Sequence, residues 1–134
     1  MRLVVDTGVF SAALSARRRP SFDGLVRQLS GNQLWLVAQT VAELRFGALV
    51  AGWGEARRAR LEESIATATV VPITDALISQ VATLRHACQV QGLPLASSAH
   101  ANDLWIAAST IHIDAALVTA DRVFEDVPGL TLAR

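Results

Sequence analysis

The sequence predicts an α/β protein built on a mostly parallel sheet. Short apolar runs alternate with longer amphipathic segments along the chain, and Gly or Pro residues separate most of them. This alternation is typical of strand–helix–strand units. Because the crossovers between parallel strands place helices against the sheet, we expect helices on both of its faces.

Composition narrows the class of protein further. With 134 residues, of which 51% are hydrophobic and 18% charged, the chain suits one compact domain, residues 1–134, and not a disordered segment. Its apolar runs fall short of the roughly 18 residues that span a bilayer, so we expect no membrane contact. The first run is also too short for a secretory signal, and the single cysteine, Cys88, forms no disulfide within the chain. Both features predict a cytoplasmic protein.

The first third of the chain predicts two strands and two helices. Leu3–Val5 and Leu34–Val37 are short and continuously apolar, as buried strands are. The segment Val9–Leu14 predicts a helix. The run of arginines and the proline that follow it end the helix. Phe22–Leu29 predicts a second helix, which ends at Gly31.

The middle of the chain predicts three helices around one short strand. Helical periodicity covers Thr40–Val50, and a charged helix over Glu55–Ala66 follows two glycines. Thr69–Val71 is β-branched throughout and predicts a strand. Thr74 is the N-cap of the next helix, whose apolar stripe is formed by Leu77, Val81, Leu84 and Cys88.

The last third predicts one helix and two strands. Gly92 and Pro94 end the preceding helix. Asn102–Ile111 again has helical periodicity, Ala116–Thr119 predicts a buried strand, and Leu130–Leu132 predicts an edge strand.

Four acidic residues stand where strands end or helices begin. Asp6 and Asp121 follow predicted strands, so both emerge at the carboxyl edge of a parallel sheet, where such folds bind ligands. Glu43 and Asp103 lie near the starts of predicted helices, which begin at the same edge. We therefore expect the four carboxylates to meet in one crevice.

A cluster of four carboxylates attracts positive charge. Two unit charges about 4 Å apart repel by ~4 kcal/mol at an effective dielectric of about 20, so the cluster would take up protons or a cation. Oxygen-only ligands favour Mg²⁺ or Mn²⁺ over zinc, and such an ion lowers the pKa of a bound water. The pattern therefore indicates metal-assisted hydrolysis.

Each acid also has a structural interpretation. Thr40–Glu43 matches a capping box, in which the Glu43 carboxylate bonds the start of its own helix. Asp103 complements a helix dipole, and Asp121 suits a turn. Asp6 fits a functional role better, because a carboxylate directly after a buried strand needs partners.

Other residues carry weaker signals. Cys88 and the three tryptophans fit packing in the core or at an interface. His100, three residues before Asp103, is either a proton donor or substrate contact on a loop, or an ordinary surface histidine. The run Arg17–Arg19 either binds phosphate or forms a solvated loop. The absence of lysine excludes P-loop and Schiff-base sites.

Four segments in this order resemble the PIN-domain family, in particular the VapC-like ribonuclease toxins of type II toxin–antitoxin modules. They are Leu3–Thr7, Ala42–Gly47, Asn102–Ala108 and Leu117–Asp121, and the similarity extends over nearly the whole chain. The resemblance implies a three-layer α/β/α fold with a central parallel sheet and an acidic site for one or two Mg²⁺ or Mn²⁺ ions.

The four acids of that family correspond to Asp6, Glu43, Asp103 and Asp121. The resemblance implies that Asp6 and Asp103 ligate metal directly. It makes Glu43 a ligand or a base that positions water, and Asp121 a ligand of a second metal or one that acts through water.

Neighbouring residues have supporting roles in this comparison. Thr7 and Thr119 match hydroxyl residues that hydrogen-bond the metal ligands. Glu125 and Asp126 lie close by in the sequence and are candidates to share the role of Asp121. The candidate phosphate contacts are Arg17, Arg18, Arg19, Arg45 and Arg122.

The resemblance implies a metal-dependent endoribonuclease toxin that is neutralised by a cognate antitoxin. It would hydrolyse an RNA phosphodiester in an unstacked, single-stranded loop and leave a 5′-phosphate. A homodimer or a toxin–antitoxin hetero-oligomer is the expected assembly. Two alternatives remain: a PIN-domain nuclease that processes RNA or cuts DNA without an antitoxin, and a catalytically silent protein-binding module.

Overall fold

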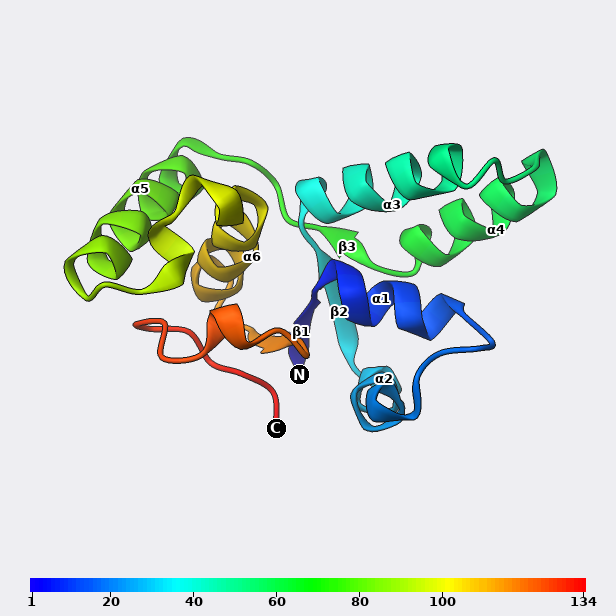
Figure 1. Ribbon diagram of the computed structural model, residues 1–134, viewed down its shortest axis with the longest axis horizontal. Helices are drawn as coiled ribbons and strands as arrows, with labels where there is room; N and C mark the ends of the chain where they lie inside the picture. The colour runs from blue at the N-terminus through cyan, green and yellow to red at the C-terminus, as the bar shows by residue number, and fades with distance from the viewer.

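The computed structural model describes all 134 residues and has three layers, with a parallel sheet between two layers of helices (Figure 1). The strands lie in the order β3-β2-β1-β4 and span Thr69–Val70, Gln33–Leu36, Arg2–Val5 and Ala116–Val118. One face is covered by α1 (Thr7–Leu14), α2 (Asp23–Leu29), α3 (Ala38–Val50) and α4 (Glu55–Ala66), and the other by α5 (Asp75–Val90) and α6 (Ala101–His112). The predicted α/β fold class and parallel sheet are confirmed.

Residues of each central strand alternate between two cores. In β1, Leu3 and Val5 pack in the core beneath α1, α3 and α4, whereas Val4 packs in the core beneath α5 and α6. A strand buried on both faces has no polar side, which is why the sequence shows a continuous apolar run. The predicted stripe of α5 is also buried, and the hydroxyl of Thr74 caps this helix by accepting from the N–H of Leu77.

Two helices begin two residues earlier than predicted, α1 at Thr7 in place of Val9 and α3 at Ala38 in place of Thr40. Helix α3 begins at Ala38 with Val37 as its N-cap, because β2 passes into the helix without a loop. Thr40 therefore lies inside the helix, where its buried hydroxyl accepts a hydrogen bond from Thr7. The capping box with Glu43 does not form.

The predicted edge strand Leu130–Leu132 was also wrong. This segment makes one isolated bridge, between Leu132 and Leu117 of β4. The chain turns at Gly129, which has a φ of +79°, and runs beside β4 for too few residues to form a ladder. Three-residue 3₁₀ helices, among them η3 (Ser98–His100) and η4 (Arg122–Phe124), complete the connections.

The order of the strands in the sheet reverses at one position. Strands β2 and β3 lie on one side of β1, and β4 lies on the other, so the order reverses between β1 and β4. In open α/β sheets the carboxyl ends of the strands at such a reversal flank a crevice. None of the helices combines the length and the apolar character that a membrane crossing requires.

Candidate active site

Asp6 joins β1 to α1 at the point where the strand order reverses. Its Oδ1 accepts the N–H of Val9 at 2.8 Å, which makes it the N-cap of α1, and its Oδ2 accepts the hydroxyl of Thr119. Val5 pairs with Val118 in parallel register, so Asp6 and Thr119 are the next residues of two adjacent strands. The register therefore produces this contact between residues 113 positions apart.

Asp121 sits in the turn after β4. Its Oδ1 accepts the N–H of Val123 at 3.0 Å, and its own N–H donates to the Thr119 hydroxyl at 3.0 Å. The turn predicted for Asp121 is thus present. Because Thr119 bonds both Asp6 and Asp121, it fixes the two acidic residues relative to each other.

Glu43 and Asp103 come from helices on opposite faces of the sheet. Glu43 lies in the second turn of α3, and its Oε1 accepts the side-chain amide of Asn102 at 3.3 Å. Asp103 lies in the first turn of α6, with its Oδ2 at 3.1 Å from Nδ1 of His100. The hydrogen bond between Glu43 and Asn102 therefore connects α3 on one face of the sheet with α6 on the other.

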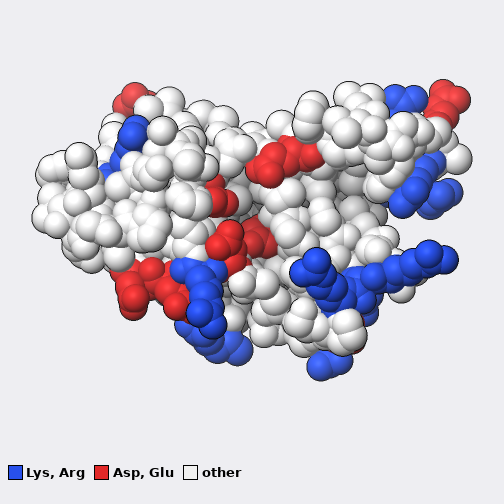
Figure 2. All heavy atoms as spheres, viewed as in Figure 1, with Lys and Arg blue, Asp and Glu red and all other residues white.

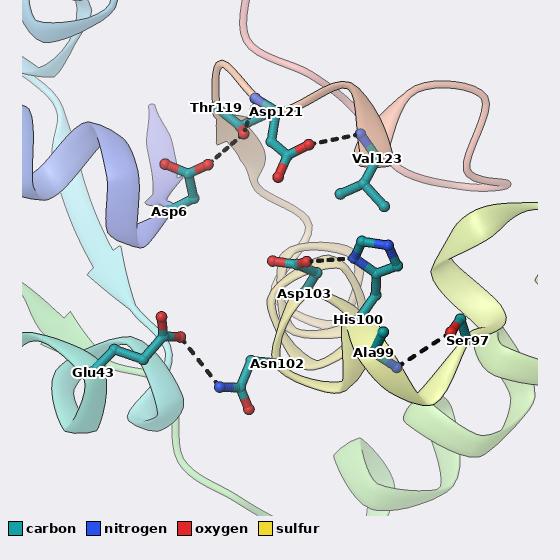
Figure 3. A network of polar contacts seen from close by, with 10 residues as sticks. All are labelled: Asp6, Glu43, Ser97, Ala99, His100, Asn102, Asp103, Thr119, Asp121 and Val123. Atoms are coloured by element: carbon teal, nitrogen blue, oxygen red, sulfur yellow. Dashed lines mark hydrogen bonds and ion pairs between the residues drawn. The ribbon is translucent and has the colours of Figure 1, made fainter. Parts of the chain in front are cut away.

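The four carboxylates surround one open space in Figure 3, which draws them with their hydrogen-bond partners. All four line a single cleft of about 440 Å³, together with Thr7, Gly8, Phe22, Ile106 and Ala120. Glu125 and Asp126 are exposed and do not line this cleft. The structure thus brings together the four acids that the sequence singled out.

Burial and mutual repulsion perturb two of these acids. Burial raises the pKa of the Asp6 carboxyl, the hydrogen bonds from Thr119 and Val9 oppose the rise, and the carboxylates of Asp121 and Asp103 add to it. Burial also raises the pKa of Glu43, against the hydrogen bond from Asn102, and the nearby Asp103 contributes. The carboxylates are therefore close enough to repel one another, so a cation among them would be stabilised.

The donor set of the cleft suits a hard divalent cation, since it consists of carboxylate and hydroxyl oxygens. As the side chains stand, no three acidic, histidine or cysteine side chains converge closely enough to hold one ion. The observed hydrogen bonds explain this separation, because Glu43, Asp103 and Asp121 are each turned toward a partner of their own. Rotation about side-chain bonds would be needed to bring their oxygens onto a common ion.

The arginines named as phosphate contacts have different surroundings. Arg18 pairs with Asp23 at 2.8 Å, and Arg45 pairs with Glu62 at 2.7 Å in a hollow between α3 and α4. Arg17, Arg19 and Arg122 are exposed and make no ion pair. None of the five lines the acidic cleft.

Sequence reasoning missed one partner of the acids, Asn102, which it named only as part of a segment. His100 was a candidate proton donor or substrate contact, and the structure places its Nδ1 against Asp103. The spacing of His100 and Asp103 places them one helical turn apart, which is a signal for a contact. Nothing local in the sequence signals the contact of Asn102 with Glu43, because 59 residues separate them.

Comparisons with known proteins agree with this architecture. The profile of the PIN domain matches residues 3–130. The VapBC2 structure from Rickettsia felis, bound to a DNA fragment from their promoter, superposes with a TM-score of 0.79 at 22% identity and covers 99% of this chain and 98% of that one. VapBC-1 from nontypeable Haemophilus influenzae gives 0.77 at 22% identity, covering 99% and 97%. FitAcB from Neisseria gonorrhoeae gives 0.73 at 20% identity, covering 98% and 96%. No curated protein sequence matches the chain.

Proposed function

Since this chain belongs to the PIN domain family, whose members are generally nucleases, we propose that it is a Mg²⁺- or Mn²⁺-dependent endoribonuclease toxin held in check by a cognate antitoxin. The observation that carries the proposal is the cleft at the strand-order reversal, where four carboxylates from separate elements meet. Capping explains the position of Asp6 and the turn explains Asp121, whereas Glu43 caps no helix and accepts its hydrogen bond from Asn102 of α6.

The residues of the cleft divide into metal ligands and positioning groups. Asp6 and Asp103 would hold the ion directly, and Asp121 would hold a second ion or act through water. Each carboxylate has about four lone-pair sites, so the hydrogen bonds that orient Asp6 leave acceptor capacity for a cation. The hydroxyl of Thr119 would hold Asp6 in this geometry, whereas the hydroxyl of Thr7 donates to Thr40.

When bound, a divalent ion supplies a water of lowered pKa and neutralises charge on the phosphate and the leaving oxygen. Glu43 would orient that water and accept its proton, since it lines the same cleft as Asp6 and Asp103. In this scheme water would attack phosphorus in line and the bond from phosphorus to the 3′ oxygen would break. The leaving oxygen would take up a proton from solvent, while Glu43 would hold the proton of the attacking water. The products are a 3′-hydroxyl and a 5′-phosphate.

The proposal of an antitoxin rests on the structural neighbours, which are toxin–antitoxin complexes such as VapBC2 and VapBC-1. A patch on α3 offers a surface for a protein partner, since Phe46, Leu49 and Val50 lie on one face of the helix and are 67%, 63% and 71% exposed. A homodimer or a hetero-oligomer with the antitoxin would cover it.

The test is sequencing of cellular RNA 5′ ends after brief expression of the wild type and of Asp103→Asn. We expect new 5′-phosphate ends and growth arrest with the wild type alone, and relief when the cognate antitoxin is coexpressed. Equal 5′ ends from both proteins would contradict the site assignment. Cleavage of DNA in place of RNA would favour the alternative nuclease, and no cleavage at all would favour a silent binding module.

A further inference from the structure

A second hollow lies beside the acidic cleft, between the carboxyl end of α1 and helix α4. It measures about 580 Å³, and its lining includes Arg17, Trp53, Arg57 and Arg60 but no acidic residue. An intermediate hollow of about 330 Å³ shares Trp53 and Arg57 with it. The intermediate hollow also shares Glu43 with the acidic cleft. The intermediate hollow therefore lies between the other two, and we call the hollow lined by Arg17, Trp53, Arg57 and Arg60 the α1–α4 groove.

Charge is divided across the face that holds this groove. Figure 2 shows acidic side chains near the middle of this face and a group of arginines at its right-hand end. Arg17, Arg57 and Arg60 are exposed and make no ion pair with the chain. Their guanidinium groups are therefore free to bind an anion, in contrast to those of Arg18 and Arg45.

The guanidinium group of Arg57 is held in place by an aromatic ring. It lies over the ring of Trp53 at 3.9 Å from the centroid, and Trp53 is itself half-buried against the core. Stacking restricts the orientation of the guanidinium plane while its N–H groups stay free at the edge. Less conformational entropy is then lost when Arg57 binds a phosphate.

The helical period separates the arginines of α4 into two sets. Arg57 and Arg60 are three residues apart and line the α1–α4 groove, whereas Arg58 lines the hollow between α3 and α4, near Glu55 and Glu62. Helix α4 therefore provides both the groove residues and a matched arginine outside the groove.

We propose that the α1–α4 groove binds the sugar–phosphate backbone of single-stranded RNA that enters the acidic cleft, with Arg17, Arg57 and Arg60 as its phosphate contacts. This inference rests on the proposed function and names the substrate subsite that this function needs. Four carboxylates repel a polyanion, so a strand can reach them only if positive charge beside the cleft holds its flanking phosphates. A groove with three free arginines and no acidic residue in its lining meets that need.

The inference is tested by fluorescence anisotropy with a labelled, mixed-sequence single-stranded RNA, in EDTA so that no cleavage occurs. The proteins are the wild type, Arg57→Gln/Arg60→Gln, and the control Arg58→Gln. Loss of two phosphate contacts on a single strand reduces the slope of log Kd against log salt concentration by about 1.4. We expect that change in the double variant with a Kd raised by roughly tenfold, and neither effect in the control.

Several outcomes would overturn the inference: no RNA binding by the wild type, an unchanged slope in the double variant, or an equal loss in Arg58→Gln, which would indicate bulk charge only. Unchanged RNA binding with lost antitoxin binding would assign the groove to the protein partner instead. Because the assay needs no metal, its failure leaves the RNA cleavage test of the proposed function intact. The exposed substitutions should leave the chain folded, with a cooperative thermal transition whose midpoint falls only by what the stacking of Arg57 on Trp53 contributes.

Discussion

At the scale of single residues, Thr119 has the most consequential contacts in the site. Its hydroxyl donates to the Asp6 carboxylate and accepts the N–H of Asp121, so one small side chain orients two candidate ligands. A hydroxyl that orients a ligand acts on the metal only through that ligand.

Replacing Thr119 by Val removes both hydrogen bonds while keeping the shape of the side chain. We expect the affinity for Mn²⁺, measured by isothermal titration calorimetry, to fall by about 10–100-fold. Thr119→Ser keeps the hydroxyl and serves as the control. Equal affinities in the Val and Ser variants would show that the hydroxyl does not position the ligands.

Asp6 predicts a specific pH dependence of stability. Burial raises its pKa in the folded chain, so over the pH range between its ordinary and its raised pKa the folded state holds a proton that the unfolded state has lost. The stabilising contribution is thus complete below the ordinary pKa and is lost as the pH rises through the folded one.

We therefore expect the metal-free wild type to lose stability relative to Asp6→Asn as the pH rises from acidic to neutral values. Asparagine preserves the N-cap of α1, and burial, the largest cause of the raised pKa of Glu43, acts in both proteins. The measurement is urea unfolding in EDTA across a pH series. A difference in unfolding free energy that is constant with pH would contradict the burial argument.

At the scale of secondary-structure elements, the position at which α3 begins decides whether Glu43 is a helix-capping residue or a residue of the site. The T-x-x-E pattern at Thr40–Glu43 predicted a capping box, but the helix begins two residues earlier. Local patterns identified the helix correctly and placed its start wrongly, because the last residues of a buried strand and the first residues of a buried helix are equally apolar.

Glu43→Gln separates the structural from the functional interpretation. Because Glu43 caps nothing, we expect its replacement to change the free energy of unfolding by no more than about 0.5 kcal/mol while it abolishes RNA cleavage. Thermal unfolding and a cleavage assay on the same samples measure both. A loss of about 1 kcal/mol would instead indicate a capping role.

At the scale of the whole molecule, the net charge is zero, but positive and negative residues are unevenly distributed along the chain. Residues 1–60 carry nine arginines and four acids, and the remainder carries three arginines and eight acids. Folding places Asp6 and Glu43 from the basic part beside Asp103 and Asp121 from the acidic part, which concentrates negative charge in one cleft.

A cation that binds only the folded cleft should stabilise the whole chain. At a concentration about 100 times its Kd, Mn²⁺ adds about 2.7 kcal/mol to the free energy of unfolding. We expect a rise in the melting temperature of the wild type with added Mn²⁺, and none in Asp6→Asn/Asp103→Asn. An equal rise in both proteins would place the ion outside the cleft.

The sequence alone determined the fold class, most elements and the four acids at strand ends and helix starts, because burial periodicity and chain breaks are local properties. Only the tertiary structure decided that Thr119 bonds Asp6, that Asn102 bonds Glu43, and that Arg57 and Arg60 face a groove that Arg58 avoids. Such pairings depend on strand register and on the packing of helices from distant parts of the chain. No residue carries that information by itself.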